Sequence, residues 1–138
     1  MNQAVLPGAV LDASALIALI LEESGAHRVQ DAIRRGALMS TINWAEALSR
    51  LAERGDPVDV SVPRITRLAV TTGALTVVPF DDLMAVEVAR LRMPTKSLGL
   101  SLADRACLAL GRLRRLPVLT TDRAWRSLHI SVKVEVIR

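Results

Sequence analysis

Short apolar segments alternate with longer amphipathic segments along almost the whole of this 138-residue chain. The apolar segments are rich in Val, Leu and Ile, which is typical of strands, and the segments between them carry apolar residues at helical spacing. This alternation predicts an α/β fold with a mainly parallel sheet of about five strands and helices on both faces. The expected strands are Ala9–Asp12, Leu38–Ile42, Leu75–Pro79, Pro117–Thr120 and Val132–Ile137. The expected helices are Ser14–Glu22, Ala26–Arg35, Trp44–Arg54, Pro63–Thr71, Asp82–Arg92 and Leu102–Leu116, with a short helical turn at Arg123–Leu128.

Length and composition favour one domain spanning residues 1–138. Hydrophobic residues make up 51% of the chain but aromatic residues only 2%, so the expected core is aliphatic. The only cysteine, Cys107, excludes an internal disulfide and fits a reducing cytoplasm. No Lys or Arg precedes Arg28, and Asp12 interrupts the apolar stretch Ala4–Leu21, so we expect neither a targeting segment nor a membrane span.

The charge balance favours a polyanionic partner. The net charge is +4, from 18 basic and 14 acidic residues, and 16 of the basic residues are arginine. If the acidic residues that cluster in the fold face a metal, the remaining surface has a still larger positive excess, which attracts phosphate. A single exposed arginine is more simply read as part of a solvated helix face, so only the overall balance supports this inference.

Four carboxylates stand where an apolar segment gives way to a helix start: Asp12, Glu46, Asp104 and Asp122. Asp12 ends the first expected strand, Glu46 lies just beyond the second, and Asp122 follows the fourth. Because the site of an open parallel sheet forms outside the carboxyl ends of its strands, these three acids are predicted to point to one edge. Asp104 follows no strand, but it lies in the first turn of a helix whose start would lean over that edge.

Gathered carboxylates indicate a metal site. Two unit charges about 4 Å apart repel by roughly 4 kcal/mol at an effective dielectric constant of 20, so such a cluster stays ionised only with divalent cations. Carboxylate oxygens and water suit Mg²⁺, with Mn²⁺ as an alternative, whereas zinc requires His and Cys at short spacing. His27 and His129 lie far from each other and from every acid in the sequence, and we interpret both as surface residues.

Helix capping is the competing explanation for each of these acids. Ser101 with Asp104, and Asn43 with Glu46, have the spacing of capping boxes. Asp12 and Asp122 fit simple N-caps. The pair Asp81–Asp82 also follows an apolar strand, and we interpret it as a cap alone. Capping does not explain why four acids fall at points that the predicted sheet topology brings together.

The segments that contain the acids resemble, in order, the landmarks of PIN-domain nucleases, and most closely those of VapC-type toxins. These segments are LDASAL around Asp12, NWAE ending at Glu46, GLSLADRACLAL around Asp104 and LTTDRAW around Asp122. The resemblance spans the length of the chain and implies a PIN-like three-layer sandwich. One departure is Ala124, because many relatives carry an acidic or polar residue there, so the number of ligands for a second metal stays open.

The resemblance also implies a function. VapC-type toxins are Mg²⁺-dependent endoribonucleases that cut structured RNA such as transfer or ribosomal RNA, usually form homodimers, and are silenced by a cognate antitoxin. By this analogy Asp12, Glu46, Asp104 and Asp122 are the expected metal ligands and catalytic residues. The expected reaction is phosphodiester hydrolysis.

Other residues near the acids admit two interpretations. Ser14 and Thr121 either orient the carboxylates or water, or are ordinary capping hydroxyls. Arg105 and Arg123 follow candidate ligands and either contact substrate phosphate or do not. The two tryptophans, Trp44 and Trp125, follow amphipathic spacing, which favours core packing over base stacking.

Two other functional classes stay open. A phosphatase with Asp12 as nucleophile usually requires a second acid two residues later, where this chain has Ser14. A non-catalytic RNA-binding or regulatory protein with a degenerate metal site is the stronger alternative, because Ala124 weakens one corner of the site.

Overall fold

The computed structural model describes residues 8–138, with the side chains of residues 70–72 left out. Its sheet has five strands in the order β3-β2-β1-β4-β5, and all four pairings are parallel, as the sequence predicted. The strands are β1 (Ala9–Leu11), β2 (Ala37–Ser40), β3 (Leu75–Val78), β4 (Val118–Thr120) and β5 (Val134–Val136). The helices are α1 (Ala13–Ile20), α2 (Ala26–Arg34), α3 (Thr41–Glu53), α4 (Val58–Thr72), α5 (Asp82–Arg92) and α6 (Leu102–Arg114), with single 3₁₀ turns η1 (Lys96–Leu98) and η2 (Arg123–Ser127).

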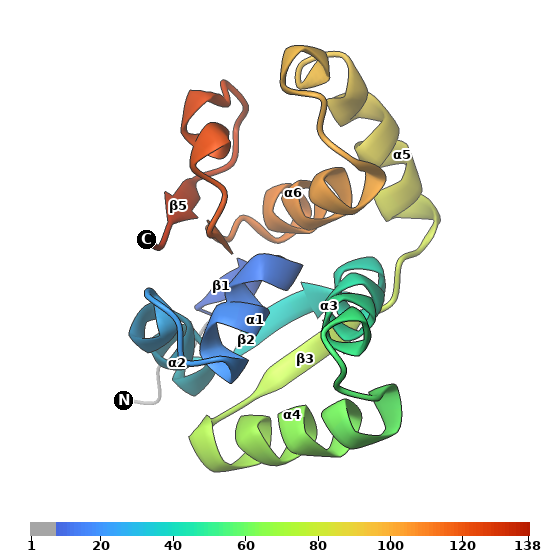
Figure 1. The fold of residues 1–138 in the computed structure, drawn as a ribbon. Coiled ribbons are helices and arrows are strands. Elements are labelled where there is room, and N and C mark those ends of the chain that lie inside the picture. Colours follow the sequence, from blue (N-terminus) through green and yellow to red (C-terminus); the bar gives the residue numbers. More distant parts are fainter. Residues whose placement is uncertain (1–7) are drawn as a thin grey trace.

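Alternating strand residues divide the core into layers. Val10 of β1 is in register with Leu38 and Val118, and these three side chains pack with α5 and α6. Leu11 and Leu119 point to the opposite face and pack with α1 and α2. Figure 1 shows α5 and α6 on one side of the sheet and α1, α2 and α4 on the other, so the predicted three-layer arrangement is confirmed.

Helix α3 begins earlier than the sequence suggested. The predicted second strand ran to Ile42, but β2 ends at Ser40, whose hydroxyl accepts a hydrogen bond from the Ile42 amide and caps α3. The expected capping box between Asn43 and Glu46 is therefore wrong, since both residues lie inside the helix. A β-branched residue at Thr41 favoured the strand prediction, and the serine cap overrides that preference.

Helix α4 also begins before its predicted start at Pro63. It starts at Val58 after an N-cap at Pro57, so Pro63 lies inside the helix, where it has no amide hydrogen for the helical ladder. Sequence reasoning places proline at the first helical position. Here the burial of Ile65 against α1 and α3 holds the helix in place despite the lost hydrogen bond.

Two predicted caps are confirmed. The Asp81 carboxylate accepts a hydrogen bond from the Met84 amide and caps α5. Ser101 and Asp104 form the expected capping box at the start of α6. The core is mainly aliphatic, but Trp125 is almost fully buried in it, and Trp44 and Phe80 pack half-buried against it. In residues 8–138, the helices are all too short or too polar to span a lipid bilayer.

The close approach of α6 to β4 depends on Gly111, and this leads to a stability prediction. A Cβ atom at this position would overlap a methyl group of Val118 and lie 3.2 Å from the Leu116 carbonyl oxygen. Gly111→Ala should lower the free energy of unfolding by about 1–3 kcal/mol, because overpacking outweighs the higher helix propensity of alanine. Urea unfolding measures this change.

The double variant Gly111→Ala, Val118→Ala provides the control. Removing the valine methyl groups makes room for the new Cβ atom, so the double variant should be more stable than the sum of the single changes predicts. A Gly111→Ala protein as stable as the wild type would contradict the packing of α6 on β4 described here.

Candidate active site

Asp12 is the most strongly held of the four candidate acids. It directly follows the central strand β1 and is only 6% exposed. Oδ1 accepts hydrogen bonds from the Ser14 hydroxyl at 2.6 Å and the Ala15 amide at 2.8 Å, and Oδ2 accepts one from the Thr120 hydroxyl at 2.5 Å. The Asp12 carboxylate therefore caps α1 and is fixed at the carboxyl end of the sheet.

Burial makes the charged form of Asp12 unfavourable. Loss of water raises the pKa of this carboxyl group from 3.8 to about 6, while the hydrogen bonds from Ser14, Thr120 and Ala15 lower it and the charge of Asp104 raises it further. The hydrogen bonds offset only part of the cost of desolvation. A divalent cation beside Asp12 would remove the rest of that cost.

Glu46 and Asp104 lie close enough to interact electrostatically. Glu46 lies in the second turn of α3 and forms an ion pair with Arg50 at 3.6 Å. Burial raises the pKa of Glu46, Arg50 lowers it and the Asp104 charge raises it. Asp104 completes the capping box of α6, where its Oδ2 accepts a hydrogen bond from the Ser101 amide. Capping and membership of the acid cluster are thus compatible roles for Asp104.

The charges of the candidate acids reach the buried Cys107. The thiol is fully buried one turn after Asp104 on α6, and its pKa is raised, first by burial and then by the charges of Asp12, Asp104 and Glu46. The predicted core position of Cys107 is confirmed. The charges of three candidate acids, Asp12, Glu46 and Asp104, therefore act on this one buried thiol.

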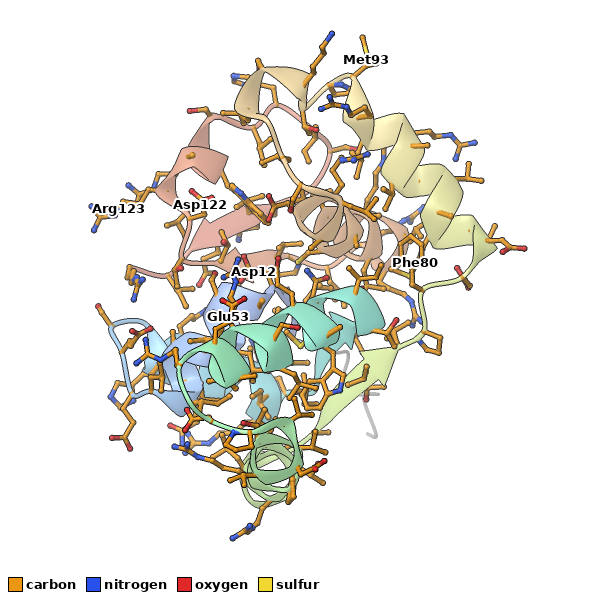
Figure 2. All side chains as sticks on the ribbon, turned by 45° about the vertical axis from the view of Figure 1, so that its right-hand side comes forward. Asp12, Glu53, Phe80, Met93, Asp122 and Arg123 are labelled. Carbon is orange, nitrogen blue, oxygen red and sulfur yellow. The ribbon has the colours of Figure 1, made fainter. Side chains whose placement is uncertain are left out.

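Asp122 lies at the margin of the cluster. Its carboxylate is exposed and accepts a hydrogen bond from the Ala124 amide, which caps η2 as the alternative interpretation expected. It is not among the charges that shift the pKa of Asp12, Glu46 or Cys107. Its backbone amide donates to Thr120 Oγ1, the same hydroxyl that holds Asp12, and Figure 2 places Asp12 between Asp122 and Glu53.

Asn43 ties the helices of two other acids together. It is fully buried in α3, and its Nδ2 donates to the Ala103 carbonyl oxygen of α6 at 2.9 Å. Ala103 immediately precedes Asp104, so this bond fixes Glu46 relative to Asp104. Within residues 8–138 the Oδ1 atom of Asn43 has no hydrogen-bond donor.

The supporting hydroxyl was assigned one position too late in the sequence. Ser14 does orient Asp12, but the partner from β4 is Thr120, whereas Thr121 contributes its backbone amide to Ser14 at 3.0 Å. Thr120 could have been identified from the sequence, since it is the only polar residue of β4, a buried strand that pairs with β1. The parallel register of β1 and β4 brings it opposite Asp12.

The other candidate substrate contacts have structural partners. The Arg105 guanidinium donates to the Val88 carbonyl oxygen of α5 at 3.1 Å, and Arg123 Nε donates to the Arg138 carbonyl oxygen at 3.4 Å. Core packing of Trp125 and partial burial of Trp44 agree with the sequence interpretation. His27 and His129 are exposed, as expected.

The acids do not form a ready-made metal cage. In residues 8–138 no group of three His, Cys, Asp or Glu side chains is arranged to hold a metal ion. The cluster nevertheless has only oxygen donors, which suit hard cations such as Mg²⁺.

Comparison of the sequence with models of protein families assigns the chain to a known family. The family model of the PIN domain matches residues 9–130. The chain belongs to the PIN domain family. The match includes all four candidate acids. Among curated protein sequences, none matches this chain.

Solved structures share the PIN-domain fold. DNA-bound VapBC from Salmonella typhimurium matches with a TM-score of 0.70 and 14% identity over 94% of this chain and 98% of that chain. FitAcB from Neisseria gonorrhoeae has a TM-score of 0.64 and 23% identity over 91% and 95% of the two chains. VapBC-5 from Mycobacterium tuberculosis has a TM-score of 0.56 and 24% identity over 96% and 98%. At these identities the likeness establishes the fold.

The raised pKa of Asp12 predicts a pH-dependent stability. In the unfolded chain Asp12 ionises near pH 3.9, against about 6 in the folded protein. Between these values the folded state binds more protons, so without divalent metal this residue destabilises the protein as pH rises from about 4 to about 6. Asp12→Asn keeps a good N-cap and removes the titration. The free energy of unfolding of Asp12→Asn, relative to that of the wild type, should rise by roughly 3 kcal/mol between about pH 4 and pH 7.

Urea unfolding in the presence of a chelator tests this prediction. Asp81→Asn is the matched control, because Asp81 also follows a strand and caps a helix but lies outside the acid cluster. If the advantage of Asp12→Asn shrinks as the pH rises, the hydrogen bonds to the carboxylate outweigh its desolvation and the interpretation of the site is wrong.

Proposed function

We propose that this PIN-domain protein is a Mg²⁺-dependent endoribonuclease and the toxin of a type II toxin–antitoxin pair. The observation that carries the proposal is Asp12, a buried carboxylate at the carboxyl end of the central strand whose pKa is raised to about 6, with the charge of Asp104 acting on both Asp12 and Glu46. Burial destabilises the charged forms of Asp12 and Glu46 and raises the pKa of both. Strongly perturbed carboxylates that converge at a strand edge indicate a functional site.

The donor chemistry of the cluster fits a divalent cation. All three carboxylates supply oxygen, and the nearby Arg50 lowers the pKa of Glu46. Asp12, Glu46 and Asp104 would hold Mg²⁺ or Mn²⁺, and Asp122 is a further proposed ligand. When bound, the cation lowers the pKa of the attacking water and stabilises negative charge on the leaving oxygen.

The chain's own residues orient this chemistry. Thr120 and Ser14 fix both oxygens of Asp12, which prevents the carboxylate from rotating. Ser101 fixes one oxygen of Asp104, and Asn43 fixes the helix that carries Glu46. Such hydrogen bonds to ligand residues commonly change metal affinity tenfold to a hundredfold. The proposed site is thus rigid at Asp12 and adjustable at Glu46.

Charge and family likeness support RNA as the substrate and a protein as the inhibitor. The arginine-rich chain has a net charge of +4, which suits a polyanion such as transfer or ribosomal RNA. A similar structure is described as a toxin–antitoxin complex from Klebsiella pneumoniae, with a TM-score of 0.63 and 22% identity over 88% of this chain and 92% of that chain. We propose a cognate antitoxin, a homodimer and a cytoplasmic location by this analogy.

A non-catalytic RNA-binding or regulatory role is the second candidate. Two observations favour it: the acids form no preformed cage in residues 8–138, and Asp122 is exposed beside Ala124. A cleavage assay with metal-binding calorimetry separates the two candidates, because a regulatory protein would bind RNA without cutting it.

RNA cleavage should require Mg²⁺ or Mn²⁺ and should fall roughly a hundredfold or more in Asp12→Asn, because the neutral amide loses several kcal/mol of charge stabilisation. Asp81→Asn changes the same functional group at another strand-to-helix cap and should leave cleavage unchanged. Gel assays on total RNA with and without chelator provide the measurement. Equal cleavage by chelated and metal-loaded protein would contradict metal dependence.

Expression of the wild type alone should arrest growth, because an unrestrained ribonuclease depletes functional RNA. Asp12→Asn should be harmless, and co-expression with the protein encoded beside the toxin should restore growth and yield a complex that co-purifies. Sequencing of RNA ends after induction would identify the target. Equal toxicity of wild type and Asp12→Asn would show that the arrest does not come from the carboxylate site.

A further inference from the structure

A hollow of about 330 Å³ opens directly beside the acid cluster. Ser14 and Thr121 form its wall toward Asp12, and the last turns of α3 contribute Arg50 and Arg54. Arg138 also lines the hollow. A volume of this size is at the lower end of that of ligand pockets.

Hydrogen bonds connect the hollow to the proposed site of cleavage. The Ser14 hydroxyl donates to Asp12 Oδ1 and accepts a hydrogen bond from the Thr121 amide. The same two residues line the hollow, so its wall and the support of Asp12 are one structure. An RNA strand whose scissile bond lies at Asp12 must extend away from Asp12 on both sides. The hollow begins at the residues that hold Asp12.

The arginines that line the hollow differ in whether an acidic side chain pairs with them. Arg138 pairs with Glu23 at 3.4 Å, and Arg50 pairs with Glu46 at 3.6 Å. In the part of the chain that the structure describes, Arg54 has no ion-pair partner, although Glu53 also lines the hollow. The positive charge open to a new ligand is therefore concentrated at Arg54.

We propose that this hollow binds a backbone phosphate of the RNA substrate next to the scissile phosphate, with Arg54 as its main contact. This inference rests on the proposed nuclease function. Arg50 assists from one turn earlier on α3, and Glu53 opposes binding by repelling the phosphate. Phosphate is favoured over an acidic peptide because the hollow continues directly from the support of Asp12, where the scissile phosphate lies.

Binding measurements in an Asp12→Asn background test the inference without cleavage. The probe is a fluorescently labelled single-stranded oligoribonucleotide of mixed sequence, about ten nucleotides long, followed by anisotropy over a range of salt concentrations. Arg54→Gln should weaken binding about fivefold and reduce the salt slope by about 0.7, the value for one phosphate contact on a single strand. Glu53→Gln should strengthen binding, and Arg54→Lys should retain most of it.

Arg92→Gln is the matched control, since it removes one exposed arginine at the end of α5. Equal weakening by Arg54→Gln and Arg92→Gln would overturn the inference, because only net charge would then matter. Stronger competition by polyglutamate than by unlabelled RNA would overturn it in favour of a protein ligand.

Failure of the phosphate site can be distinguished from failure of the nuclease proposal. If the wild type does not cleave RNA while Arg54→Gln still weakens binding, the phosphate site stands and the nuclease proposal fails. If the wild type cleaves RNA while Arg54→Gln leaves binding unchanged, the phosphate site alone is rejected.

Discussion

The buried carboxylate of Asp12 is the constraint on which the arrangement of the site depends. Placing an ionisable group at the end of the central strand is unfavourable, and three hydrogen bonds from Ser14, Ala15 and Thr120 only partly compensate for it. These partners come from α1 and from β4, which lies beside β1 in the sheet. Asp12 therefore links β1 to β4 at one point. Any further carboxylate of the site has to lie around that point.

The other acids depend on contacts between helices rather than on the sheet. Helix α3 contacts both α1 and α6, and the buried Asn43 side chain forms the hydrogen bond that sets α3 against the first turn of α6. Within residues 8–138 the buried Oδ1 atom of Asn43 has no hydrogen-bond donor, and an unpaired buried acceptor costs about 1–3 kcal/mol, so this atom is a further destabilising feature beside the acid cluster. Unfavourable features thus accumulate at this edge, as they do at functional sites.

The sequence predicted the sheet because its strands follow from local patterns. Apolar runs identified all five strands, and the rule for parallel sheets placed Asp12 at their carboxyl edge. The failures lie where a capping hydrogen bond or a tertiary contact overrides the preference read from the sequence. Ser40 outcompetes the strand preference of Thr41, and the burial of Ile65 keeps Pro63 inside α4. Thr120 was missed because the pairing of β1 with β4 joins residues more than 100 positions apart.

The distribution of hydrogen bonds bears on how acids without a preformed cage would bind the proposed cation. Both oxygens of Asp12 are held by the protein, but the structure assigns a partner to only one oxygen of Asp104, and Glu46 has only a long ion pair with Arg50. A cage closed in advance would bring the three charges still closer and raise the cost of ionising them. Asp12 is fixed, whereas the side chains of Glu46 and Asp104 can adjust, and this limits the repulsion between the three charges in the free protein. The energy needed to gather the proposed ligands would then come from the cation itself, once it occupies the site.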